Sequence, residues 1–189
     1  MIDHPFARCY ERRAQLGNEH SYLLALVQRF SYVFPERNLL EVVKRFSPLV
    51  ELGAGTGYWA YLLNSIGADV IAYDLAPVDG PRPNRYHLEV RPWSVVHGGD
   101  AGVLAQHRSR SLFLCWSPRY SSLWECLQHY SGDYVLCITD GGRRTPTFAG
   151  LEEGEKSAAS CRCSVFRHET KLAPRIRGGI RDGRGEIVL

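Results

Sequence analysis

The chain has 189 residues, 44% of them hydrophobic, which is enough for one compact domain spanning 1–189 and too few for two ordinary domains. The net charge is +3 and the basic residues are almost all arginine, a skew that by itself is weak support for a nucleic-acid partner. No apolar run approaches the roughly 18 residues of a membrane span, and Asp3 and Pro5 stand where a secretory signal needs its charged and apolar regions, so we expect a cytoplasmic protein without a membrane partner.

The first 48 residues are expected to form a helical cap made of two helices. Asn18 can cap the first helix, and Pro48 ends the second. The apolar positions at helical spacing are Leu23, Leu26, Val27 and Phe30 in the first helix and Leu39, Leu40, Val43 and Phe46 in the second.

Five short apolar runs follow, at 49–52, 69–73, 94–97, 111–115 and 133–139. Segments able to form helices separate most of them, and strands that alternate with helices pair in parallel through right-handed crossovers. The sequence therefore predicts an α/β fold with a doubly wound, mainly parallel sheet and a core at 49–140. Because Cys115 and Cys137 lie inside two of these runs, we expect free thiols rather than disulfides.

Two glycines predict where helices of the core end. Gly67 sits where a left-handed residue would close the helix begun at Gly57, and Gly132 would close a helix that starts at Ser121. Between the second and third strands, 76–93 carries four prolines and cannot hold a long regular helix.

The C-terminal segment 141–189 is rich in glycine and arginine. Its only helical candidate is 151–160, which is short and contains a glycine. We expect the chain to close with an antiparallel hairpin formed by 161–173 and 186–189.

The segment 49–60, LVELGAGTGYWA, has the pattern of a strand, a tight turn and a helix. Gly53, Gly55 and Gly57 remove side chains where the backbone must turn and approach a ligand, and the helix that follows presents free N–H groups toward that ligand. Seventeen residues after Gly57, Asp74 ends the second predicted strand, where it can accept both hydroxyls of a ribose. These residues predict a nucleotide-type site at the carboxyl ends of the strands.

The spacing of the glycines separates two classes of ligand. Dinucleotide-binding turns need G-x-G-x-x-G or a final alanine, because that residue packs the helix against the strand beside a pyrophosphate. Here the spacing is G-x-G-x-G, and the residue three after Gly55 is Tyr58. A tyrosine there disfavours a pyrophosphate and favours a nucleoside with a small zwitterionic tail, which leaves a nicotinamide oxidoreductase as a remote alternative.

The loop resembles the first motif of the class I, Rossmann-like methyltransferases, which is close to the E-x-G-x-G-x-G formed by Glu51, Gly53, Gly55 and Gly57. The resemblance spans about 49–140. It implies a Rossmann-like methyltransferase fold with S-adenosyl-L-methionine as the cofactor.

The resemblance also implies a role for each matching residue. Glu51 would reach the methionine amino group, Asp74 the ribose and Leu75 the adenine, while Asp100 with Ala101, in HGGDAG, would contact the adenine edge. Asp74 and Asp100 also have plainer structural roles open to them, as a strand-end cap and a helix N-cap. The cofactor-binding residues implied are Glu51, Gly53, Ala54, Gly55, Thr56, Gly57, Tyr58, Asp74, Leu75, Asp100, Ala101, Cys115 and Trp116.

A narrower resemblance is to poorly characterised methyltransferase-like proteins whose fourth strand ends in L-F-L-C-W-P-P-Y. The present chain has LFLCWSPRY at 112–120 and departs at Ser117 and Arg119. This likeness implies the same fold and supplies no substrate.

Trp116 and Tyr120 are the candidate catalytic residues, in the sense that they would position the substrate. The end of the fourth strand faces the transferred methyl group in class I enzymes, and the two rings could hold a cationic amine or the sulfonium by cation–π contact. Tyr10, Tyr32 and Phe34 could form a lid over the cofactor, although aromatic residues near a helix more often pack in the core.

The expected function is therefore transfer of a methyl group, by in-line displacement, to a nitrogen of a small-molecule acceptor, with oxygen second. Two alternatives stay open: a nucleic-acid methyltransferase or binding module that uses the arginine-rich 162–184, and an inactive cofactor-binding partner subunit. No metal site is expected. Cys126 with His129 and Cys161 with Cys163 are possible ligand pairs, but neither is joined by a further pair that would complete a zinc site.

Overall fold

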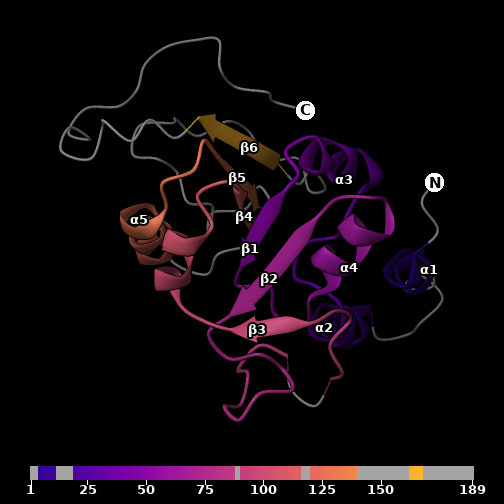
Figure 1. Ribbon diagram of the computed structural model, residues 1–189. Helices are drawn as coiled ribbons and strands as arrows, with labels where there is room; N and C mark the ends of the chain where they lie inside the picture. Colours follow the sequence, from indigo (N-terminus) through magenta and orange to yellow (C-terminus); the bar gives the residue numbers. More distant parts are fainter. Residues whose placement is uncertain (1–3, 12–18, 88–89, 116–119, 140–161, 168–189) are drawn as a thin grey trace.

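The computed structural model describes residues 4–11, 19–87, 90–115, 120–139 and 162–167. In this part of the chain six strands form one sheet in the order β3-β2-β1-β4-β5-β6 (Figure 1). β1 to β5 pair in parallel, and β6 is antiparallel to β5. The predicted α/β fold with a mainly parallel sheet is confirmed. The strands are β1 (Leu49–Leu52), β2 (Val70–Asp74), β3 (Val96–Gly98), β4 (Ser111–Cys115), β5 (Tyr134–Thr139) and β6 (Arg162–Arg167).

Helices cover both faces of the sheet, as Figure 1 shows. They are α1 (Pro5–Glu11), α2 (Glu19–Arg29), α3 (Arg37–Lys44), α4 (Tyr58–Ser65), the 3-10 helix η2 (Ala101–Gln106) and α5 (Tyr120–His129). The core between the sheet and α1 to α4 includes Leu40, Leu63 and Phe113. The core on the other face, against η2 and α5, includes Leu104 and Leu123.

The strands alternate their side chains between these two cores, as the two-residue period of a strand requires. In β1, Leu49 enters the first core and Val50 the second. Glu51 therefore shares the face of Leu49, the face that α4 covers, although it is a carboxylate. Carboxylates are rarely buried in a core position, so Glu51 makes the end of β1 a candidate functional site.

The strand order reverses at β1, which lies between β2 and β4. α4 connects β1 to β2 on one face, and η2 leads from β3 to β4 on the other. Consequently the carboxyl ends of β1, β2 and β4 are neighbours, and the loops that leave them diverge to opposite faces. Such a switch point is where open α/β sheets bind their ligands.

The N-terminal segment contains one more helix than the two predicted. α1 precedes α2, and its first residue is Pro5, whose fixed φ and missing N–H suit the first position of a helix. Phe6 of α1 is buried between Phe30 and Phe34, with ring centroids 5.0 Å from each. Seven residues are too few for a clear periodic signal, so only the tertiary contact reveals the helix. The predicted cap Asn18 lies outside the described residues.

The predicted helix ends are confirmed at one glycine and wrong at the other. Gly67 has φ +86° and follows α4. Gly132 does not have a positive φ. Its reason for being glycine is close packing: a Cβ there would collide with the ring and hydroxyl of Tyr130 and lie 2.9 Å from the carbonyl oxygen of Arg108.

The hydroxyl of Tyr130 ties α5 to the sheet beside this glycine. It accepts a hydrogen bond from the N–H of Leu112 at 3.1 Å and lies within donating distance of the carbonyl oxygens of Arg110 (2.8 Å) and Tyr134 (2.7 Å). Tyr130 is buried, so water cannot replace the hydroxyl if it is removed.

Replacing Tyr130 with phenylalanine is expected to lower the free energy of unfolding by about 1–3 kcal/mol, because a buried N–H and two carbonyls lose their partner. Urea denaturation measures the change. The matched control is Tyr134→Phe at the start of β5, where the side chain is partly exposed. There we expect a change within about 0.5 kcal/mol. Equal effects of the two substitutions would contradict this role of Tyr130.

The remaining predictions concern the irregular segments. The described residues between β2 and β3 contain no helix or strand, as the prolines of 76–93 predict. The third strand begins at Val96, two residues later than predicted. β6 forms the antiparallel edge by pairing with β5, while the predicted helix 151–160 and strand 186–189 lie outside the described residues. Cys115 and Cys137 are reduced thiols, as expected.

Candidate nucleoside-binding site

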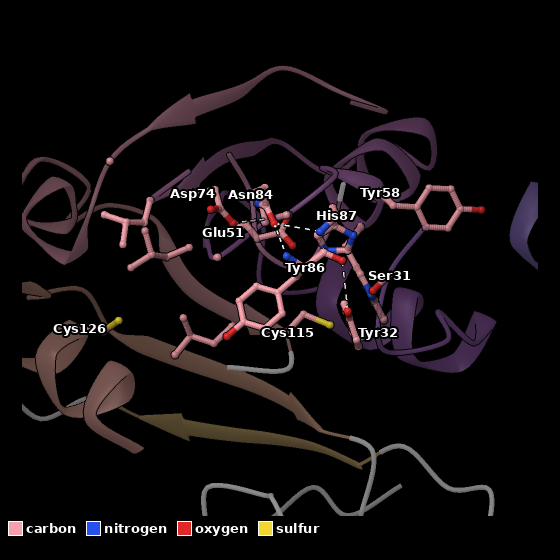
Figure 2. A pocket seen from close by; sticks show the side chains of 18 of the residues that line it. Ser31, Tyr32, Glu51, Tyr58, Asp74, Asn84, Tyr86, His87, Cys115 and Cys126 are labelled. Carbon is pink, nitrogen blue, oxygen red and sulfur yellow. Dashed lines mark hydrogen bonds between the residues drawn. The ribbon is translucent and has the colours of Figure 1, made fainter. Parts of the chain in front are cut away.

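A pocket of about 480 Å³ opens at the carboxyl ends of β1, β2 and β4 (Figure 2). Every predicted cofactor residue in the described part of the chain lines it except Thr56 and Gly57, and Trp116 lies outside that part. The lining residues are Phe30, Ser31, Tyr32, Glu51, Leu52, Gly53, Ala54, Gly55, Tyr58, Trp59, Asp74, Leu75, Asn84, Tyr86, His87, Gly99, Asp100, Ala101, Leu114, Cys115, Glu125 and Cys126.

The glycine loop between β1 and α4 turns through left-handed backbone. Gly53 and Gly55 have φ +79° and +55°, values that L side chains rarely adopt. The N–H groups of Gly53 and Ala54 both point at the carbonyl oxygen of Tyr73, at 2.9 and 3.0 Å, so the end of β2 holds the loop in place. The backbone of the loop consequently lies open to the pocket.

Thr56 and Gly57 lie behind the loop, where they build it and do not line the pocket. The Thr56 hydroxyl donates to the carbonyl oxygen of Phe30, at the end of α2. Gly57 caps α4 with φ +72°, and a Cβ there would lie 2.6 Å from the Oγ of Ser94. The two residues therefore attach the loop to the N-terminal helices and to the segment before β3.

The carboxylate of Asp74, at the end of β2, joins the glycine loop to the start of the crossover. Its Oδ2 accepts the N–H of Gly55 at 2.8 Å and its Oδ1 accepts the N–H of Ala76 at 2.9 Å. A carboxylate has about four acceptor sites, so each oxygen retains capacity for one hydroxyl of a ligand. Asp74 thus ends β2, as predicted, and its contact with a ribose stays a prediction.

Glu51 is the most unusual group of the pocket. It is only 2% exposed, and its Oε2 is the one buried side-chain polar atom without a hydrogen-bond partner in the described residues. Burial, and secondarily the charge of Asp74, raises the pKa of Glu51 to about 8. The free protein at neutral pH therefore holds this carboxyl mostly protonated.

Asp100 has the structural role considered for it and also borders the pocket. Its Oδ1 accepts the N–H of Gly102 at 2.9 Å, which makes it the N-cap of η2, and its side chain also lines the pocket. Ala101 lines the pocket beside it, and Leu75 lies at the rim with 65% of its surface exposed. An exposed leucine at a pocket rim offers an apolar face for a flat ring.

The crossover 76–93 contributes lining residues that sequence reasoning missed. Asn84 organises them: its Oδ1 accepts the N–H groups of Tyr86 (2.9 Å) and His87 (3.1 Å), and its Nδ2 donates to the carbonyl oxygen of Ala76 at 2.7 Å. An asparagine after a proline is a recognised turn former, which is the only local signal for this arrangement. Nothing in the sequence indicates that the turn folds back onto the glycine loop.

His87 lies directly against that loop. Its Nδ1 is 2.7 Å from the carbonyl oxygen of Gln28, and a Cβ on Gly55 would lie 2.5 Å from its Nε2. The ring of Tyr32 meets it edge-on at 5.4 Å, and the Tyr32 hydroxyl donates to the carbonyl oxygen of Tyr86 at 3.2 Å (Figure 2). The segment after α2 and the crossover thus meet over the pocket.

Tyr58, the first residue of α4, lines the pocket, and its side chain is buried in the core beneath the N-terminal helices. Its hydroxyl accepts the N–H of Phe6 at 3.1 Å and contacts Nδ1 of His4 at 2.9 Å, while Nε2 of His4 is 3.2 Å from the carbonyl oxygen of Pro35. In Figure 2 the hydroxyl points away from the other labelled side chains. The helix α1 is therefore anchored on Tyr58, the residue whose presence after Gly55 disfavours a dinucleotide.

The structure describes only part of the segment that carries the candidate substrate residues. Cys115, at the end of β4, lines the pocket, whereas Trp116 lies outside the described residues and Tyr120 is the first residue of α5. Of the proposed lid, Tyr32 lines the pocket and Phe34 packs against the core beside His4.

The described residues contain no group of three or more histidine, cysteine or acidic side chains placed to hold a metal ion. None of the helices in the described ranges is long and apolar enough to cross a membrane.

Comparison with known proteins finds similarity in structure alone. No protein-family profile and no curated protein sequence matches the chain. Among solved structures it is similar to the glycopeptide N-methyltransferase MtfA, crystallised with S-adenosyl-L-methionine, at 16% identity and TM-score 0.36, covering 68% of this chain and 64% of that one. It is also similar to the CcbJ methyltransferase from Streptomyces caelestis, at 16% identity and TM-score 0.35, covering 69% and 59%. The chain thus spans less than two thirds of either protein.

Proposed function

We propose that the pocket binds S-adenosyl-L-methionine and that the protein is a methyltransferase acting on a small-molecule acceptor. The observation that carries the proposal is the buried carboxyl of Glu51, whose Oε2 has no hydrogen-bond partner in the described residues, beside a loop of left-handed glycines. An unsatisfied buried polar group costs roughly 1–3 kcal/mol, and a ligand that brings a cationic donor removes that cost. The ammonium group of an amino acid, directly or through a water, is such a donor.

The other groups of the pocket fit the rest of that cofactor. Asp74 has acceptor capacity for ribose hydroxyls, and the open backbone of the glycine loop leaves room for a close approach. Leu75 and the start of η2 at Asp100 would border the adenine. A dinucleotide fits less well, because Tyr58 occupies the position where a pyrophosphate needs glycine or alanine.

Bound in this way, the cofactor supplies an electrophilic methyl group on a sulfonium. The chain's own contribution is then to hold the ligand, to exclude water and to align an acceptor, because an in-line displacement gains most from positioning. No group in the described residues has to act as a strong base for that purpose.

The acceptor is proposed to be a nitrogen of a small metabolite, with oxygen as the second choice. Trp116 and Tyr120 would position it, since both follow β4, whose end at Cys115 borders the pocket. Aromatic rings attract cationic amines through their faces.

The cheapest test is calorimetric titration of the purified protein with S-adenosylhomocysteine. We expect a single site with a micromolar dissociation constant, a binding free energy of about −8 kcal/mol, and no comparable binding of NAD. A folded protein that does not bind S-adenosylhomocysteine would overturn the proposal.

Incubation with S-adenosylmethionine carrying a tritiated methyl group then separates the acceptor classes. Label in the low-mass fraction of a metabolite extract supports the proposed acceptor, and label in RNA supports a nucleic-acid methyltransferase instead. Cofactor binding without any labelled product would identify an inactive binding subunit and refute catalysis.

A further inference from the structure

His87 is the one imidazole that lines the pocket within the described residues, and its position is tightly defined. The backbone N–H of His87 is held by Asn84, and Nδ1 meets the carbonyl oxygen of Gln28 at the end of α2. The ring of Tyr32 packs edge-on against the imidazole. A side chain held by Gln28 and Tyr32 on a backbone fixed by Asn84 has lost its rotamer freedom before any ligand arrives, so a hydrogen bond to it costs little further entropy.

The partner of Nδ1 decides the tautomer of the ring. A carbonyl oxygen can only accept, so at 2.7 Å from Gln28 the Nδ1 atom must carry the proton. In the neutral imidazole, Nε2 then bears the lone pair. No hydrogen bond joins that atom to the described residues, and it is directed at Gly55 in the wall of the pocket.

The surroundings keep the imidazole neutral at physiological pH. Burial lowers the pKa of His87 below 6.5, and the carbonyl of Gln28 and the charge of Asp74 oppose that effect without reversing it. The titratable groups around the ring are Asp74, Tyr32 and Tyr86, and none of them is a cation. His87 therefore presents a hydrogen-bond acceptor to the pocket.

Two acceptors from different parts of the chain meet at Gly55. Oδ2 of Asp74 accepts its N–H at 2.8 Å, and Nε2 of His87 lies 2.5 Å from the position that a Cβ on Gly55 would take. Because Gly55 has no side chain, both acceptors can approach its backbone, and both residues line the pocket. Two adjacent acceptors match a ligand that carries adjacent hydroxyls.

We propose that His87 is a second sugar-binding residue, whose Nε2 accepts a hydrogen bond from one hydroxyl of the ribose while Asp74 accepts one from the other. The inference rests on the proposed function, because it presumes a nucleoside ligand. The inference makes the crossover part of the ligand-binding site. It gives a role to the turn that Asn84 fixes by hydrogen bonds and that lies against the glycine loop.

The test compares the affinity for S-adenosylhomocysteine with that for its 2′-deoxy and 3′-deoxy analogues. In the wild-type protein each missing hydroxyl is expected to weaken binding about tenfold, because a hydrogen bond to a buried acceptor is lost. In His87→Asn one of these two losses should shrink to within about twofold while the other is retained. Asparagine can keep a donor near the position of Nδ1, toward Gln28, and lacks an acceptor at the position of Nε2.

Two further variants complete the design. His87→Gln, whose longer amide can place an acceptor near the position of Nε2, should recover part of the discrimination. His97→Asn is the matched control on the exposed edge strand β3, and it should discriminate like the wild type. A His87→Asn protein that keeps both losses, or that weakens all three ligands equally, would refute the sugar contact and leave the proposed function standing.

A measurement on the wild-type protein covers the case in which the variants do not fold. The ¹⁵N spectrum of the imidazoles should show His87 as a neutral ring protonated at Nδ1, and its Nε2 resonance should shift on addition of S-adenosylhomocysteine. An Nε2 resonance that stays unchanged at saturation would overturn the inference. Absence of any binding by the wild type would instead refute the proposed function itself.

Discussion

Binding of S-adenosylhomocysteine at pH 7 is expected to release about one proton per protein, and Glu51→Gln is expected to remove that release together with at least about tenfold of the affinity. With its pKa raised to about 8 by burial and by Asp74, Glu51 holds a proton in the free protein. An ammonium group beside the carboxyl favours the charged form, so the proton leaves as the ligand enters. Calorimetry in buffers of different ionisation enthalpy counts the protons released.

The control for this experiment is Glu41→Gln on α3, which removes a carboxylate that does not line the pocket. Its affinity and proton release should match the wild type. A binding heat that is independent of the buffer, in a protein that binds the ligand normally, would show that Glu51 does not pair with the ammonium group.

Glu51→Gln is also expected to stabilise the free protein above neutral pH. The folded state keeps the Glu51 proton up to about pH 8, whereas the unfolded chain loses it near 4.5, so the free energy of unfolding falls as the pH rises through this window. The loss amounts to roughly 3–6 kcal/mol over the window. Glutamine carries no charge at any pH, so Glu51→Gln should have the flatter profile and the higher stability at alkaline pH. Urea denaturation across the window measures both, and parallel profiles would contradict the raised pKa.

Asp74→Ala is expected to weaken S-adenosylhomocysteine binding by at least about 100-fold and to lower the free energy of unfolding by about 1–3 kcal/mol, because hydrogen bonds to a charged acceptor are worth about 1.5–3 kcal/mol each. The carboxylate holds the N–H groups of Gly55 and Ala76, so its loss frees the glycine loop from the crossover as well as removing the sugar acceptor. Calorimetry and urea denaturation report the two effects separately.

Asp79→Ala is the matched control, since Asp79 is an exposed aspartate in the same crossover and does not line the pocket. It should change neither quantity. Asp74→Asn should lie between alanine and wild type, because the amide oxygen can accept from one of the two N–H groups while its NH₂ cannot accept from the other. Wild-type affinity in Asp74→Ala would mean that the ligand does not contact the end of β2.

The part of the site that local sequence could predict is the part built by one strand-turn-helix unit. The glycines that need a positive φ, and the acidic residue that ends the next strand, lie at fixed spacings, because the geometry of a βαβ unit fixes them. The alternation of buried side chains along β1 and β4 follows likewise from the strand period.

The rest depended on contacts between segments far apart in the chain. His87 meets Gln28 across 59 residues and Tyr32 meets Tyr86 across 54, and no periodicity links such positions. Gly132 shows the converse error: a glycine after a helix suggested a left-handed cap, while a neighbouring ring was the actual constraint. The local pattern indicates that a glycine matters, and only the tertiary packing shows which of its properties is used.

The anchoring of α1 on Tyr58 determines where the tyrosine hydroxyl points. Because the hydroxyl is engaged by Phe6 and His4 and points away from the other labelled pocket residues (Figure 2), it is not available to a ligand in the cavity. The rings of Phe30 and Trp93, with centroids 5.0 and 4.9 Å from that of Tyr58, pack around it and hold the phenol in place. A helix outside the cavity thereby helps to fix the first residue of α4, and with it the end of the glycine loop that borders the cavity.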